Sequence, residues 1–123
     1  MKEEVAVQSS NPFTRRWTLV VIICSLPAFL LLAWFGDPGR GRAAGIAICS
    51  IMFAARAVWS WSRHDWFWVT LGILTVLHVA LVAVIPWTSK SYPGLTLLPI
   101  AALDYGIVYG CIKLVEKVMN RTR

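Results

Sequence analysis

Residues 95–115 form one apolar stretch with a carboxylate, Asp104, near its middle. About 20 apolar residues in a helix are enough to cross the hydrocarbon core of a bilayer. An ionised side chain inside that core is costly and is rarely left without a partner. The stretch therefore requires a fold in which other membrane helices surround Asp104. Two further apolar stretches each carry a suitable group, Arg56 and His78.

Four apolar stretches of spanning length make up most of the chain, at residues 17–35, 43–61, 66–87 and 95–115. Only 15% of the residues are charged, against about 25% in a typical soluble domain. We therefore predict an all-α integral membrane protein, a four-helix bundle over residues 17–115 between an N-terminal segment 1–16 and a tail 116–123. The second stretch is rich in Gly, Ala and Ser, which let helix backbones approach closely, so we expect it inside the bundle.

The basic residues near the ends of these stretches divide unequally between the two sides of the membrane. The richer side holds Lys2, Arg15, Arg16, Arg63, Lys113, Lys117, Arg121 and Arg123, and the poorer side holds Arg40, Arg42 and Lys90. The positive-inside rule then predicts that both termini are cytoplasmic, in the inner membrane if the source is a bacterium. The basic residues at the ends of the spans thus explain the formal charge of +6 as a determinant of membrane topology. No nucleic-acid partner is predicted.

Three ionisable groups fall within the predicted spans, and they fall at similar depths. His78 and Asp104 each lie nine residues from the outer end of their span, about 13 Å down at about 1.5 Å per residue. Arg56 lies about 6 Å deeper on the same count, which an arginine side chain can bridge. A polar cluster of Arg56, His78 and Asp104 would hold three helices in register, unless Arg56 instead extends to the cytoplasmic interface. The functional alternatives are a proton or ion relay through His78 and Asp104, or an anion site at Arg56.

Ala102, Gly106 and Gly110 recur every four residues on the fourth stretch and include a GxxxG motif. Such a stripe allows close approach of another helix. At about 100° per residue, Gly106 is rotated by about 200° from Asp104, so the stripe faces away from the polar side. The first functional hypothesis is therefore an accessory, assembly, immunity or regulatory protein that binds a larger membrane protein or its own copy through this stripe. The alternative is a proton-linked small transporter or channel that uses His78 and Asp104.

Motifs for soluble-type catalysis and for metal binding are missing from the sequence. Cys24, Cys49 and Cys111 all lie in apolar stretches, and neither a CxxC motif nor a Cys/His cluster occurs. GxSxG, HExxH and P-loop patterns are also missing. We therefore predict no catalytic residue, no metal and no cofactor. An enzyme that acts on lipid within the membrane through His78 and Asp104 is the remaining catalytic alternative.

Overall fold

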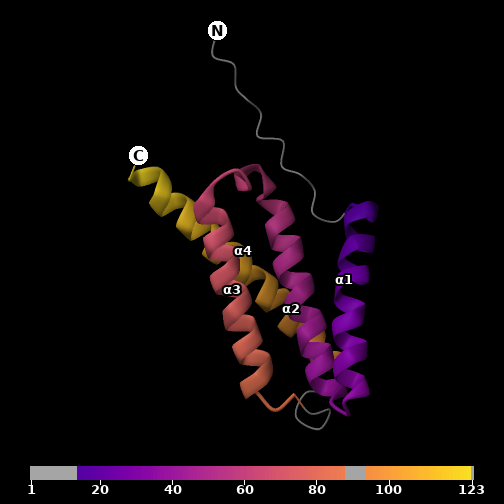
Figure 1. Cartoon of the computed structure of the whole chain (residues 1–123). Helices are drawn as coiled ribbons and strands as arrows, with labels where there is room; N and C mark the ends of the chain where they lie inside the picture. Colours follow the sequence, from indigo (N-terminus) through magenta and orange to yellow (C-terminus); the bar gives the residue numbers. More distant parts are fainter. Residues whose placement is uncertain (1–13, 88–93, 123) are drawn as a thin grey trace.

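A computed structural model describes residues 14–87 and 94–122 of the chain. Its elements, in order, are α1 (Arg15–Trp34), α2 (Pro38–Ala57), the short 3-10 helix η1 (Trp59–Trp61), α3 (Asp65–Val84), the 3-10 helix η2 (Gly94–Thr96) and α4 (Leu97–Arg121) (Figure 1). The described part of the chain is therefore all-helical, as predicted. Most of the predicted N-terminal segment lies outside the described residues.

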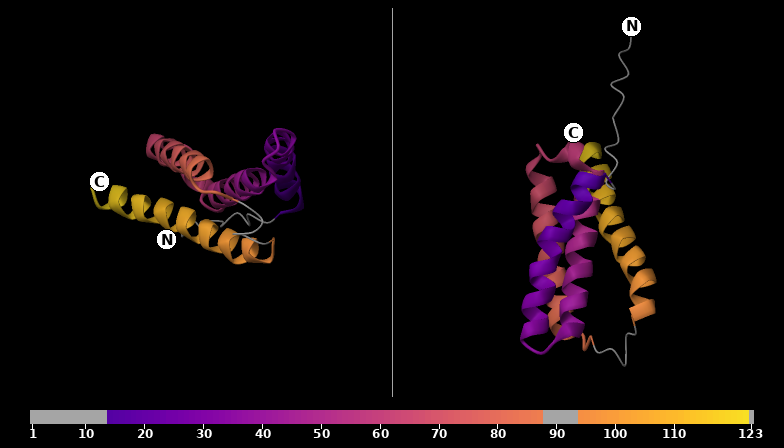
Figure 2. Two further views of the ribbon diagram at one scale, coloured as in Figure 1. Left: turned by 90° about the horizontal axis from the view of Figure 1, so that it is seen from below. Right: turned by 90° about the vertical axis from the view of Figure 1, so that its right-hand side faces the viewer.

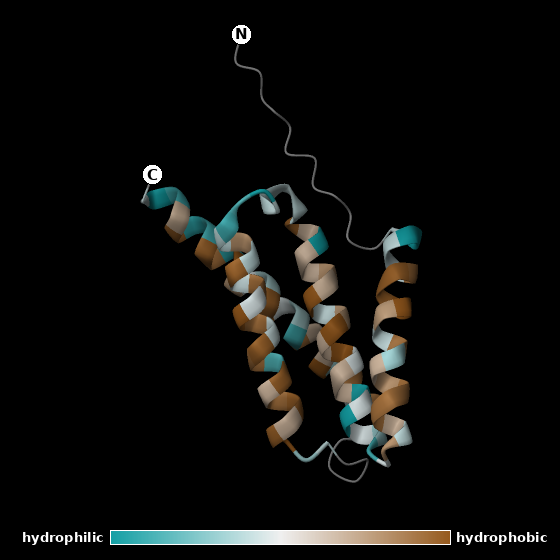
Figure 3. Cartoon of the chain, in the orientation of Figure 1, coloured by the Kyte–Doolittle hydropathy of each residue, from teal (hydrophilic) through white to brown (hydrophobic). Residues whose placement is uncertain are grey.

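Three of the long helices, α1, α3 and α4, are long and apolar enough to cross a membrane. These three helices support the prediction of a membrane protein. α2 has the same length as α1 and α3, 20 residues, but it carries three arginines and many small residues, and it does not meet the same hydropathy criterion. The brown bands that mark apolar residues accordingly cover α1 and α3 more fully than α2 (Figure 3).

The connection between α1 and α2 is tighter than the sequence suggests. α1 ends at a turn in which Gly36 adopts φ of 83°, a left-handed conformation that glycine accepts readily. Asp37 then caps α2, because its side chain accepts the backbone N–H of Arg40 at 3.0 Å, and Pro38 occupies the first helical position. α2 therefore begins at Pro38, five residues before the predicted start of the second apolar stretch.

α2 is the central helix of the fold, and it packs against α1, α3 and α4. Viewed along the helices, α3, α2 and α1 lie in a row, and α4 runs across one side of that row (Figure 2, left). α4 is inclined to α2, so its first turns stand apart from the other helices (Figure 2, right). An apolar groove of about 770 Å³ opens there between α1, α2 and α4.

The core lies at the end of the molecule that contains the α2–α3 connection. It consists of Ala54, Ala55, Val58, Phe67, Leu74, Val108 and Ile112, all buried. Large apolar side chains on the other faces of α1, α3 and α4 are exposed, as expected where helices meet lipid rather than protein. α2 contributes more buried residues than any other helix, in agreement with its predicted place inside the bundle.

Candidate functional site

The structure brings together two of the three ionisable residues that the sequence places within the spans. His78 of α3 lies against Asp104 of α4, with 2.8 Å between the imidazole Nε2 and the carboxylate Oδ1. His78 is buried, and 21% of the Asp104 side chain is exposed. The shared depth counted from the sequence therefore corresponds to a direct contact between α3 and α4.

Arg56 lies elsewhere, and within residues 14–87 and 94–122 no ion pair joins it to Asp104. Its guanidinium carbon is 5.6 Å from the centroid of the Trp17 ring on α1, in a cation–π arrangement. The reason is its direction on α2. Arg56 is rotated by about 200° from Ala54, which lies in the core between α2, α3 and α4, so Arg56 faces α1 instead.

The second ring nitrogen of His78 determines where the protons of the pair lie. Nδ1 is 2.7 Å from the carbonyl oxygen of Leu74, one turn earlier on α3. A carbonyl oxygen only accepts, so Nδ1 must carry a hydrogen and donate it. The Nε2–Oδ1 contact then needs its own proton, which lies either on the imidazole, giving His⁺ and Asp⁻, or on the carboxyl, giving two neutral groups. In both arrangements the pair is neutral overall, which is the arrangement least costly within a membrane.

A small cavity of about 70 Å³ lies beside this pair, between α2, α3 and α4. Apolar side chains of the three helices, together with His78, Asp104 and Trp87, line it. The volume is sufficient for at least one water molecule, and the polar atoms of the pair could hold it. His78 also lines a groove of about 430 Å³ between α2 and α3, together with Arg40. His78 therefore lines both the small cavity beside Asp104 and the groove between α2 and α3.

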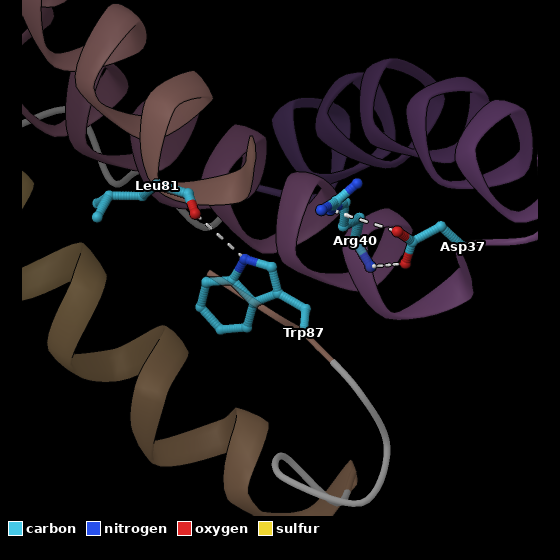
Figure 4. Close-up of polar contacts among 4 residues, drawn as sticks. All are labelled: Asp37, Arg40, Leu81 and Trp87. Atoms are coloured by element: carbon cyan, nitrogen blue, oxygen red, sulfur yellow. Dashed lines mark hydrogen bonds and ion pairs between the residues drawn. The ribbon is translucent and has the colours of Figure 1, made fainter. Parts of the chain in front are cut away.

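Figure 4 shows further polar groups at the start of α2 and just beyond the end of α3. The guanidinium Nε of Arg40 is 3.3 Å from Oδ2 of Asp37. The indole Nε1 of Trp87 donates to the carbonyl oxygen of Leu81 at 3.4 Å. Trp87 is thus held over the end of α3, where it closes one wall of the inner cavity.

The predicted stripe lies on the side of α4 away from the buried core, and its first member, Ala102, also lines the apolar groove between α1, α2 and α4. Ala102, Gly106 and Gly110 are all exposed. A methyl group added at Gly106 or Gly110 would meet no other side chain or neighbouring helix within 4 Å among the described residues. The opposite face of α4 carries the buried Val108 and Ile112. The described helices of one chain therefore leave Gly106 and Gly110 uncovered.

Two partners of the site were not predicted from the sequence, namely the carbonyl of Leu74 and the indole of Trp87. The four-residue spacing from Leu74 to His78 is a usable signal, since a histidine in a helix can reach the carbonyl one turn earlier. Trp87 is the last residue of the third predicted stretch, and the sequence gives no sign of its role in the cavity wall.

Neither the arrangement of possible metal ligands nor comparison with known proteins identifies a further function for this site. Within the described part of the chain, no group of three or more His, Cys, Asp or Glu side chains could hold a metal ion. The three cysteines are free thiols. Comparison with known protein families, with characterised proteins and with solved structures finds no match.

Proposed function

We propose that this chain is a four-span membrane protein, with both termini cytoplasmic, that works by lateral association of α4 with a second copy of itself. Three apolar helices of spanning length support the membrane location. α2 has 20 residues, about 30 Å at about 1.5 Å per residue, which equals the thickness of the hydrocarbon core. Its contacts with α1, α3 and α4 support a fourth crossing beside theirs, in which protein rather than lipid surrounds the polar residues of α2.

The observation that carries the association is the uncovered stripe. Among the described residues, no neighbouring side chain or helix lies within 4 Å of a methyl group added at Gly106 or Gly110, which leaves room for a helix backbone to approach. Close approach of two backbones strengthens their van der Waals contact. In lipid such packing drives helix association, because lipid tails are as apolar as the helices and the hydrophobic effect contributes nothing.

A second copy is the occupant that this surface fits most simply. The stripe repeats every four residues along one helix, so two copies related by a twofold axis present the same small residues to each other. The stripe of each copy then fits against the other without any large side chain between the backbones.

The experiment replaces both Gly106 and Gly110 with leucine and measures association in liposomes by energy transfer between donor- and acceptor-labelled copies. We expect transfer in the wild type that falls to the background level in the double variant. Gly72→Leu on α3 is the matched control, since Gly72 is also exposed and also has no neighbouring side chain or helix within 4 Å of an added methyl group. A wild type that stays monomeric, or a double variant that still associates, contradicts the proposal.

A second candidate, proton-linked transport, is favoured by the His78–Asp104 contact and the adjoining cavity. In either arrangement one proton lies between Nε2 of His78 and Oδ1 of Asp104. The proton can move from one group to the other while the net charge of the pair stays zero. Asp104→Asn keeps a hydrogen bond to His78 but cannot release a proton. We expect this variant to remain folded and to stop proton flux in proteoliposomes. This candidate is discarded if wild-type protein carries no flux across a pH gradient.

A further inference from the structure

The start of α1 and the end of α2 enclose a cavity whose lining is strongly basic. The cavity measures about 390 Å³ and is lined by Thr14, Arg15, Arg16, Trp17, Val20 and Arg56. The described lining residues therefore include three guanidinium groups. The corresponding end of α1 is the hydrophilic band at the upper right of Figure 3.

Contacts of Trp17 fix the geometry of this cavity. The indole Nε1 of Trp17 donates to the carbonyl oxygen of Met52 on α2 at 3.2 Å, which ties the two helices together. Arg56 lies over the same indole ring, and Trp59 packs against it with ring centroids 6.2 Å apart. Arg56 is therefore held in place beside the start of α1, whereas Arg15 and Arg16 are exposed and can move toward a ligand.

The depth of the cavity indicates what kind of anion it meets. The apolar stretch of α1 begins at Leu19, two residues after Trp17, and Leu19 and Ile23 are exposed on the helix surface. Tryptophan marks the boundary between headgroups and hydrocarbon. The three arginines thus lie at the level of lipid headgroups, and apolar surface continues from them toward the membrane interior.

We propose that this cavity binds the phosphodiester headgroup of an anionic phospholipid in the cytoplasmic leaflet. Guanidinium groups bind phosphate oxygens through paired, charge-assisted hydrogen bonds. Basic pockets between helices on the cytoplasmic side are suited to anionic headgroups. Val20 and the exposed apolar side chains beyond it would contact the upper part of an acyl chain, a contact that a free phosphate ion cannot make. The site lies on α1 and α2, so it does not depend on association through α4.

The test measures which lipid the purified full-length chain retains. Protein in a neutral detergent is mixed with equal amounts of phosphatidylglycerol and phosphatidylcholine, and bound lipids are counted by native mass spectrometry. We expect a clear preference for phosphatidylglycerol in the wild type. Replacing both Arg15 and Arg16 with glutamine should lower that preference by about tenfold, which corresponds to about 1.4 kcal/mol for the two lost charges together. Arg56→Gln should lower it to a similar extent.

Arg63→Gln is the matched control, since Arg63 is an exposed arginine in the α2–α3 connection that does not line the cavity. We expect it to leave lipid preference unchanged. Equal retention of the two lipids by the wild type, or an equal loss in the Arg63 variant, overturns the proposal. A second arm adds inorganic phosphate at millimolar concentration. Displacement of phosphatidylglycerol by phosphate would assign the site to a soluble anion and overturn its assignment to lipid.

Discussion

α2 differs from the other three long helices in the side chains that it buries and exposes. Seven residues of α2 are buried, compared with one in α1, three in α3 and two in α4. The buried residues of α2 are all Gly, Ala or Ser, whereas α1, α3 and α4 expose Leu, Ile and Val over most of their length. The small buried residues of α2 suit contact with other helices, whereas the large exposed residues of α1, α3 and α4 suit contact with lipid on one side of each helix.

This difference shows what hydropathy measures in a small membrane protein. A helix that faces lipid needs large apolar side chains, because lipid is its solvent. A helix surrounded by protein needs side chains small enough for its neighbours to approach. Length and mean hydropathy therefore identify α1, α3 and α4 as spanning helices but not α2. Yet α2 is the helix that contacts all three of the others.

The largest effect that separates the two kinds of helix is expected from Ala54→Leu. Ala54 has no exposed surface and lies in the core with Phe67 and Val108. Three added carbon atoms have no space there, so we expect the free energy of unfolding in bicelles to fall by about 3 kcal/mol. Ala80→Leu, at an exposed position on α3, should change it by less than about 0.5 kcal/mol. Similar losses in both variants would remove the distinction between α2 and α3.

An intermediate effect is expected where the apolar helices α3 and α4 meet through a polar contact. Asp104→Leu leaves Nε2 of His78 without its partner, and we expect a loss of about 2 kcal/mol in the free energy of unfolding. Asp104→Asn keeps a hydrogen bond, because its amide N–H can donate to Nε2, so the loss should be less than half as large. Thermal unfolding followed by circular dichroism would compare the two. Equal stability of the leucine variant and the wild type would show that the pair does not hold α3 to α4.

The smallest effect concerns the close approach of α1 and α2. A methyl group at Gly41 would lie 2.9 Å from the backbone oxygen of Phe29, so one helix must shift. We expect Gly41→Ala to lower the free energy of unfolding by about 1 kcal/mol. Gly45→Ala, where no other helix or side chain lies within 4 Å, should be neutral or slightly stabilising because alanine favours a helix. A neutral result at Gly41 would mean that α1 and α2 are less tightly packed than the structure indicates.

The sequence predicts the elements well because the lengths of apolar stretches are set by the membrane. Counting residues from the outer ends also placed His78 and Asp104 at one depth, and they are in contact. The same count could not place Arg56, because depth does not give the direction in which a side chain leaves its helix. The start of α2 was missed because the cap formed by Asp37 and Pro38 lies in a segment whose Gly and Pro content is typical of turns.

The central claim is that α2 crosses the bilayer as a fourth span, enclosed by the other helices. Labelling of single cysteines in intact cells with a membrane-impermeant maleimide tests it, after Cys24, Cys49 and Cys111 have been replaced. Arg40→Cys and Arg63→Cys introduce thiols at opposite ends of α2. We predict that the thiol at position 40 reacts from outside and that the thiol at position 63 reacts only after the membrane is permeabilised. Reaction of both thiols from the same side would contradict the account.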